Sequence, residues 1–177
     1  MFNFDLIPVG YSPPNDVNVV VEIPKGSNIK YEIDKEIGIL RMDRRLSPSM
    51  IYPGNYGFIP QTISGDGDAE DVLILGEISI IPLAVVNTRP IGILITEDDK
   101  GEDSKIITVP SLIVDPALSE IQDIEGINPN LRNLVEHFFL HHKDLEKGKF
   151  VKIKGWKNRG YAFDVIIESM KQYKMKL

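Results

Sequence analysis

The stretch SGDGDAEDVLIL, residues 64–75, places four carboxylates within six positions and then continues directly into an apolar segment. Carboxylates this close together repel one another, so at neutral pH they need a hard cation, bound protons or bulk water between them. A solvated acidic turn is the simplest interpretation, since most charge runs face water. The rest of the chain favours a metal site instead.

Length and composition indicate one domain of ordinary size over residues 1–177. The chain is 42% hydrophobic and 26% charged, which fits a globular protein with a real core. The apolar stretch without charge at residues 78–88 is much shorter than the roughly 20 apolar residues of a membrane-spanning helix. The N-terminus shows no secretory signal pattern, and the absence of cysteine excludes disulfides and thiolate sites. We therefore expect a cytoplasmic protein with no membrane contact.

The formal net charge of −6 argues against a general nucleic-acid binder. Affinity for a phosphate backbone comes from clustered Lys and Arg and the counterions that they release. An anionic small molecule would also be repelled by this charge. A bound metal ion would reverse that local field.

The first two thirds of the chain are predicted to be rich in strands. The expected strands cover residues 17–24, 29–33, 37–43, 72–75, 83–95 and 106–110. Residues 34–36 are expected to form a hairpin loop. The dipeptide Arg89-Pro90 indicates a bulge or sheet edge. Residues 47–64 are rich in Pro, Gly and aromatic side chains, which predicts a long functional loop.

The last third changes to helical spacing of apolar residues. Residues 131–148 are predicted to be a helix, residues 149–157 a strand, and residues 161–175 an amphipathic helix. The expected fold class is α+β, with a small five-stranded closed β-barrel, similar to the OB fold, flanked by C-terminal helices.

A second acidic cluster, EDDKGEDSK at residues 97–105, also lies between two predicted strands. Two acidic clusters at strand ends are what a barrel with a metal site at one mouth would show. Oxygen ligands without cysteine favour hard cations such as Mg²⁺, Mn²⁺ or Ca²⁺ over zinc. The helix-loop-helix calcium motif is excluded, because Asp71 occupies the position where its sharp turn requires glycine and the flanking segments are predicted strands.

The acidic stretch contains DGDAEDV at residues 66–72. Seven further blocks lie along almost the whole chain: VEIP (21–24), IKYEID (29–34), DR (43–44), YPGNYG (52–57), RPIG (89–92), GEDSK (101–105) and HHKDLEKG (141–148). In content and order these blocks resemble the soluble family I inorganic pyrophosphatases in their compact prokaryotic form, and DGDAEDV matches the family signature.

The resemblance implies Mg²⁺-dependent hydrolysis of pyrophosphate to two phosphates, with Mn²⁺ as an alternative cofactor, in a homohexamer. It implies that a metal-bridged hydroxide is the nucleophile and that Asp68 is the general base. The implied metal ligands are Asp66, Asp71, Asp98 and Asp103. The implied substrate ligands are Lys30, Arg44, Tyr56, Lys105 and Lys143. The implied supporting residues are Glu22, Glu32, Tyr52 and Asp99, which leaves Glu70 as the solvated acid of its cluster.

Two positions depart from the family pattern. His142 stands where the family usually has a tyrosine that binds phosphate, and two interpretations stay open: a substrate-binding imidazole with a stronger pH dependence, or a ring that only packs on the apolar stripe of its helix. The run Glu97-Asp98-Asp99 is one acid richer than common family patterns. The sequence therefore leaves open which of Asp98 and Asp99 meets metal.

Two other functions compete with the hydrolase. One is a non-catalytic divalent-cation-binding domain, and the other is an OB-type module that binds single-stranded nucleic acid. The acidic balance and the lack of stacking aromatics among basic residues argue against the second. Metal-dependent release of phosphate from pyrophosphate separates the hydrolase from both.

Overall fold

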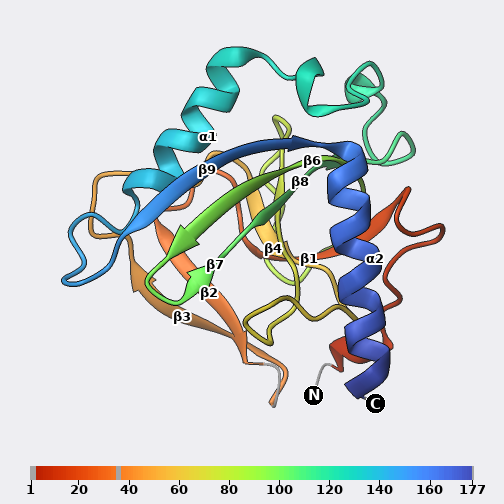
Figure 1. Ribbon diagram of the computed structural model, residues 1–177, viewed down its shortest axis with the longest axis horizontal. Helices are drawn as coiled ribbons and strands as arrows, with labels where there is room; N and C mark the ends of the chain where they lie inside the picture. The colour runs from red at the N-terminus through yellow and green to blue at the C-terminus, as the bar shows by residue number, and fades with distance from the viewer. Residues whose placement is uncertain (1–2, 35–36, 177) are drawn as a thin grey trace.

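The structure is a computed structural model, and it describes residues 3–34 and 37–176. A sheet-rich body carries one helix on each side (Figure 1). The strands are β1 (Val17–Ile23), β2 (Ile29–Asp34), β3 (Ile39–Arg45), β4 (Asn55–Phe58), β5 (Asp71–Ile74), β6 (Val85–Asp98), β7 (Gly101–Glu102), β8 (Lys105–Pro110) and β9 (Val151–Asn158). The helices are α1 (Pro129–His141), α2 (Arg159–Lys176) and the short 3-10 turns η1 (Phe4–Leu6), η2 (Pro116–Leu118) and η3 (Ile124–Gly126).

Hydrogen-bonded strand pairing runs in a ring. The order is β1, β4, β5, β8 and β6, and β6 pairs in turn with β1. The long β6 also pairs with β7 and β9, while β2 and β3 form a separate hairpin. The predicted α+β class with C-terminal helices is therefore confirmed.

Strand β1 shows why this sequence forms the centre of the sheet. Its β-branched valines fit a pleated surface, and successive side chains point to opposite faces. Val19 and Val21 pack with the α2 side chain Ile166, whereas Val20 packs with Phe58 on the other face. All three valines are fully buried, so apolar burial on both faces fixes the register of β1.

Strand β4 corrects the prediction that residues 47–64 form one long loop. Gly57 of β4 pairs with Val21 of β1. A Cβ at position 57 would lie 2.0 Å from the carbonyl oxygen of Val20, so only glycine allows the two backbones to approach. Gly57, one of the residues that suggested a loop, therefore serves a close strand pair, while the residues on either side of β4 lie outside the strands.

The other predicted elements are confirmed with shifted ends. The sheet register shifts between Pro90 and Gly92, as the predicted bulge requires. The helix predicted over residues 131–148 ends at His141 and continues as turns. Of the predicted hairpin loop at 34–36, Asp34 belongs to β2, and residues 35–36 lie outside the described residues.

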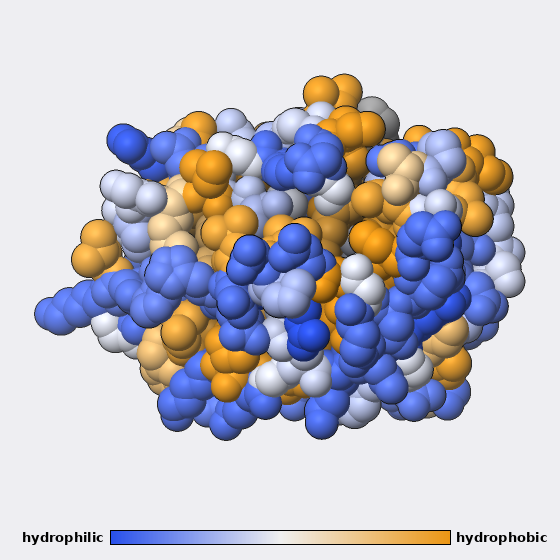
Figure 2. Space-filling view, turned by 90° about the horizontal axis from the view of Figure 1, so that it is seen from above, coloured by the Kyte–Doolittle hydropathy of each residue, from blue (hydrophilic) through white to orange (hydrophobic). Residues whose placement is uncertain are grey.

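Hydrophobic and hydrophilic side chains alternate over the face seen from above (Figure 2). Within the described ranges, no helix has the length and apolar character needed to span a membrane.

Candidate active site

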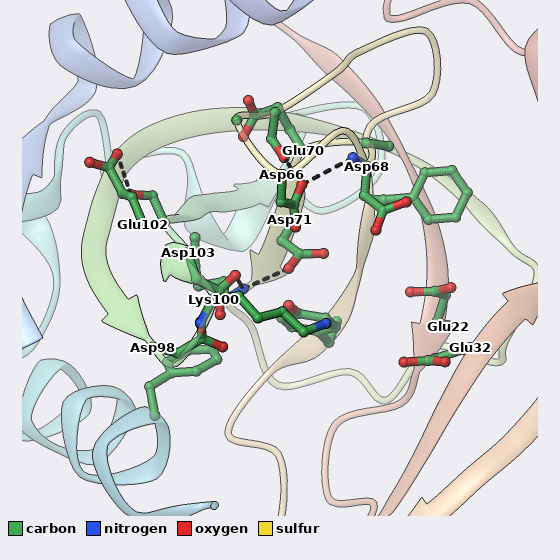
Figure 3. Close-up of a pocket in the computed structure, with 18 of the residues that line it drawn as sticks. Glu22, Glu32, Asp66, Asp68, Glu70, Asp71, Asp98, Lys100, Glu102 and Asp103 are labelled. Carbon is green, nitrogen blue, oxygen red and sulfur yellow. Dashed lines mark hydrogen bonds and ion pairs between the residues drawn. The ribbon is translucent and has the colours of Figure 1, made fainter. Parts of the chain in front are cut away.

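A cavity of about 1030 Å³ lies where the two acidic clusters meet the β2–β3 hairpin and the end of α1. Figure 3 shows carboxylates from both clusters around this space, with Glu22 and Glu32 at its other side. The predicted residues that line it are Glu22, Lys30, Glu32, Arg44, Tyr52, Tyr56, Asp66, Asp68, Asp71, Asp98, Asp103, Lys105, His142 and Lys143. The fold thus brings together residues more than a hundred positions apart in the sequence.

The floor of the cavity is organised by Lys105 of β8. Its ammonium lies 2.6 Å from Asp71 and also forms an ion pair with Asp103. Only 4% of Lys105 is exposed. Burial alone would lower its pKa, but the two carboxylates raise it to about 12. Lys105 is therefore a fixed positive charge between two acids.

Asp98, at the end of β6, connects the floor to the segment after α1. Its carboxylate accepts from Lys143 at 2.7 Å and from the backbone N–H of Lys100 at 2.8 Å. Burial opposes ionisation of Asp98, but these donors lower its pKa. Asp99 instead pairs with Lys149 at 2.6 Å and does not line the cavity. Of the two candidates left open by the sequence, Asp98 is the one at the cavity.

Residues 64–70, here called the acid loop, form one wall. The hydroxyl of Ser64 donates to Asp66, and the backbone N–H of Asp68 donates to the same carboxylate at 3.0 Å. Burial would raise the pKa of Asp66, but these donors lower it. Asp68 is exposed and lies beside Asp66 and Asp71 in Figure 3, where its carboxylate can reach a molecule in the cavity.

Glu70 corrects the expectation that it is the solvated acid. It is only 5% exposed. Its N–H donates to the hydroxyl of Thr62, and its carbonyl accepts from the N–H of Ile59. These bonds fold the loop back onto the sheet and bury the side chain. Burial, with the nearby charges of Asp71 and Asp66, raises the pKa of Glu70 to about 7.

The hairpin places two cations opposite each other, because Lys30 pairs with Arg44 in the β2–β3 register. Lys30 forms an ion pair with Glu32 and lies 3.5 Å from Asp43. Arg44 donates from Nε to Glu146 at 3.0 Å and pairs with Asp43. Carboxylates therefore hold both cations at the cavity wall.

Two buried tyrosines close the apolar side. Tyr52 packs on Phe138 of α1, with ring centroids 4.7 Å apart. Burial raises the pKa of Tyr56 well above its usual value, as do the charges of Asp71 and Asp103 and a hydrogen bond with Asp71. Tyr56 is thus a neutral phenol next to the charged floor. Glu22 accepts from the backbone N–H of Ile33 at 2.8 Å and ties β1 to the hairpin.

His142 lies at the cavity edge, directly after α1. Its ring stacks on Phe138 at 5.2 Å between centroids and meets Phe139 edge to face at 5.9 Å. It also lines the cavity. The two interpretations from the sequence therefore do not exclude each other, since the ring packs on the helix and faces the cavity.

Comparison with known proteins adds independent information. The sequence profile described as inorganic pyrophosphatase matches residues 19–174. A protein from Mesorhizobium japonicum named inorganic pyrophosphatase is 47% identical over 171 residues, which cover 96% of this chain and 97% of the relative. The chain belongs to the inorganic pyrophosphatase family. A relative of the same name from Sulfolobus acidocaldarius is 52% identical over 147 residues, which cover 83% of this chain and 85% of the relative.

Solved structures support the compact form of the pyrophosphatase family. The crystal structure of inorganic pyrophosphatase from Thermus thermophilus matches with a TM-score of 0.94 and 40% identity, over 98% of this chain and 99% of that one. The pyrophosphatase from Schistosoma japonicum shares the fold at a TM-score of 0.84 and 23% identity, and this chain covers 70% of its length. The chain therefore has the length of the bacterial structure and the predicted prokaryotic type is confirmed.

Several polar residues at this cavity were not singled out from the sequence. Asp43 and Glu146 hold Arg44, and both fall inside the blocks that resemble the family. Their position inside the blocks at 43–44 and 141–148 could have identified them as candidate site residues. Glu168 and Gln172 of α2 also line the cavity, but they come from an amphipathic helix whose sequence carries no family block.

The carboxylates that line the cavity are suitable ligands for a hard divalent cation. Carboxylate oxygens surround the cavity, and these are the ligands that hard divalent cations prefer. Among the described residues, no three Asp, Glu or His side chains form a ready-made metal group. The ammonium of Lys105 instead bridges Asp71 and Asp103, so a cation entering between these acids must displace it.

Proposed function

We propose that this chain hydrolyses inorganic pyrophosphate to two phosphates with Mg²⁺ as its cofactor and Mn²⁺ as an alternative. The observation that carries the proposal is the meeting of two acidic clusters with four cationic side chains around one cavity in a chain of the pyrophosphatase family. Carboxylates suit divalent metal, and the cations suit phosphate oxygens. Both are needed for a substrate that is itself strongly anionic.

Asp66, Asp71, Asp98 and Asp103 would hold the metal ions. When bound, divalent cations neutralise these carboxylates and lower the pKa of an attacking water. The residues fit this role because all four line the cavity and because Asp66 and Asp98 have lowered pKa values, so they stay ionised.

Asp68 would take the proton from the attacking water. It is exposed at the cavity wall, and the hydrogen bond from its N–H to Asp66 fixes the direction of the loop there. A carboxylate beside the water can accept the proton at neutral pH. In this arrangement Asp66 and Asp71 bind metal while Asp68 moves the proton.

The four cations Lys30, Arg44, Lys105 and Lys143 would bind phosphate oxygens. Each now forms an ion pair with a carboxylate. For Lys105 and Lys143 the partners are Asp71, Asp103 and Asp98, which are proposed metal ligands, so bound metal would leave these two ammonium groups available to the substrate. Tyr56 would donate its phenol hydrogen bond near the attacking water, and the remaining predicted residues Glu22, Glu32, Tyr52 and Asp99 would support these positions.

The proposal extends to architecture and assembly. The strand ring β1-β4-β5-β8-β6 supports a closed five-stranded barrel of the OB type within a single domain over residues 1–177. The family resemblance supports a cytoplasmic homohexamer. Light scattering coupled to gel filtration measures the assembly state directly.

Phosphate release from pyrophosphate, with and without Mg²⁺, tests the proposal. We expect turnover only with metal, and a decrease of about 10²–10⁴-fold in Asp68→Asn, because a general base contributes a factor of that size. Glu77→Gln, which removes the same charge from a side chain 96% exposed, is the matched control and should keep full activity.

Undiminished turnover in Asp68→Asn would remove the general-base assignment. Calorimetric Mg²⁺ or Ca²⁺ binding without any phosphate release would favour the non-catalytic cation-binding domain. Salt-sensitive binding of single-stranded nucleic acid without metal would favour the OB-type module.

A further inference from the structure

The imidazole of His142 is held in one tautomer by the end of α1. Its Nδ1 lies 2.9 Å from the backbone carbonyl oxygen of Phe139. A carbonyl oxygen only accepts hydrogen bonds, so Nδ1 is the donor and carries the proton. Because Nδ1 faces the helix backbone and the ring lines the cavity, Nε2 is the ring nitrogen available to a bound molecule.

The surroundings of His142 keep the ring neutral. Burial lowers its pKa, and the positive charges of Lys143, Lys105 and Arg44 lower it further, while the bond to Phe139 opposes them, with a result of about 4. The groups packed on the ring from α1 are the aromatic side chains Phe138 and Phe139. A neutral ring with its proton on Nδ1 presents a bare lone pair at Nε2.

The Nε2 lone pair of His142, near the cations Lys143, Lys105 and Arg44, favours a protonated phosphate oxygen. The cations attract ionised P–O⁻ oxygens, but Nε2 repels them and accepts only from a P–OH group. In the proposed reaction a water oxygen forms a new bond to phosphorus, the P–O–P bridge breaks, and the two protons of the water end on the two phosphates. Pyrophosphate that enters without a proton therefore leaves as two phosphates that each carry one P–OH.

We propose that His142 recognises the protonated oxygen of a product phosphate, with Nε2 as hydrogen-bond acceptor. The assignment rests on the proposed function, and it makes His142 a specificity residue that distinguishes HPO₄²⁻ from a tetrahedral dianion without a proton. A tyrosine at this position would offer a hydroxyl that donates as well as accepts. A histidine at this position therefore selects a different oxygen from the one that a tyrosine would select.

Sulfate is the probe for this difference, because it has the shape and charge of HPO₄²⁻ but no proton at neutral pH. Calorimetry with Mg²⁺ present gives the ratio of phosphate to sulfate affinity at matched ionic strength. We expect this ratio to decrease on the order of tenfold in His142→Phe, as loss of one hydrogen bond with a buried polar partner implies. His142→Tyr should lower the ratio too, by raising sulfate affinity.

His141→Gln is the matched control, because His141 neighbours His142 but pairs with Asp144 at 2.7 Å and does not line the cavity. Its ratio should equal that of the unmodified protein. An unchanged ratio in both His142→Phe and His142→Tyr would overturn the proposal.

A second measurement needs no substitution. Nitrogen-15 NMR of the histidine side chains reports which ring nitrogen carries the proton. We expect His142 to be the Nδ1–H tautomer at neutral pH, and an Nε2–H tautomer or an imidazolium would overturn the proposal. Neither measurement requires turnover, so a failure of pyrophosphate hydrolysis is seen separately, in the phosphate-release assay.

Discussion

The acid loop and the cavity floor hold their carboxylates by different means. On the floor, Asp71 and Asp103 share the ammonium of Lys105, which projects from a fully buried strand. In the acid loop, Asp66 is held by a hydroxyl and a backbone N–H of the loop itself. The floor is therefore fixed by charge pairs on the sheet, and the loop by local turns.

Glu70 lies where these two regions meet. Glu70 is 5% exposed, yet within the described part of the chain no Lys or Arg forms an ion pair with its carboxylate. Its neighbour Asp71 is more exposed and has such a partner in Lys105. Adjacent positions at the start of a strand face opposite sides, so Asp71 meets the ammonium of Lys105 while Glu70 is buried at the cavity without an ion pair. Ionisation of Glu70 is therefore unfavourable in the folded protein, whereas ionisation of Asp71 is supported by its ion pair.

Replacing Glu70 should have the largest effect on stability. Its pKa changes from 4.5 in the unfolded chain to about 7 in the folded protein. Between these pH values the folded state keeps a proton that the unfolded state has lost. Stability therefore decreases as pH rises through this window, by about 3 kcal/mol in total. Glu70→Gln should remove this decrease and be the more stable protein at pH 8.

Urea unfolding at pH 5 and pH 8 with a chelator present measures the difference. Glu77→Gln serves as the control, since that side chain is 96% exposed and should leave the pH dependence unchanged. Equal pH dependence of stability in Glu70→Gln and the unmodified protein would show that other interactions in the folded protein offset the cost of burying ionised Glu70.

Removing the shared ammonium should have a smaller effect. Lys105→Met leaves Asp71 and Asp103 facing each other without a cation. We expect a loss of about 2 kcal/mol in free energy of unfolding, below the about 3–5 kcal/mol of a fully buried pair. The reason is that the two carboxylate side chains are 35% and 28% exposed.

Added Mg²⁺ should recover more of the melting temperature in Lys105→Met than in the unmodified protein, because the metal replaces the missing charge. Lys152→Met is the comparison, with a side chain 62% exposed and an expected change under about 1 kcal/mol. An equal response to Mg²⁺ in both variants would contradict the account of the floor.

The sequence predicts most of the floor and less of the loop. Apolar alternation identifies β1, β6 and β8, because burial of β-branched side chains is a local property of these runs. The burial of Glu70 depends on bonds to Thr62 and Ile59 that no local pattern shows. Likewise β4 has the composition of a loop, and its pairing becomes visible only when Gly57 meets Val20. What depends on contacts between distant segments was not available from the sequence.

The smallest effect is expected for Gly67→Ala, which changes the backbone geometry of the acid loop without changing its charge. Gly67 has φ +92°, and a Cβ there would meet nothing within 4 Å, so Gly67→Ala acts only through backbone strain. We expect a loss of about 1 kcal/mol in stability and a decrease of several-fold in pyrophosphate hydrolysis, because the turn that joins Asp66 to the N–H of Asp68 must shift. Gly65→Ala is the matched control, since that position is equally open and lacks the positive φ. If both variants hydrolyse pyrophosphate equally well, the turn does not position Asp68, and the carboxylate finds its place through the bound substrate and metal instead.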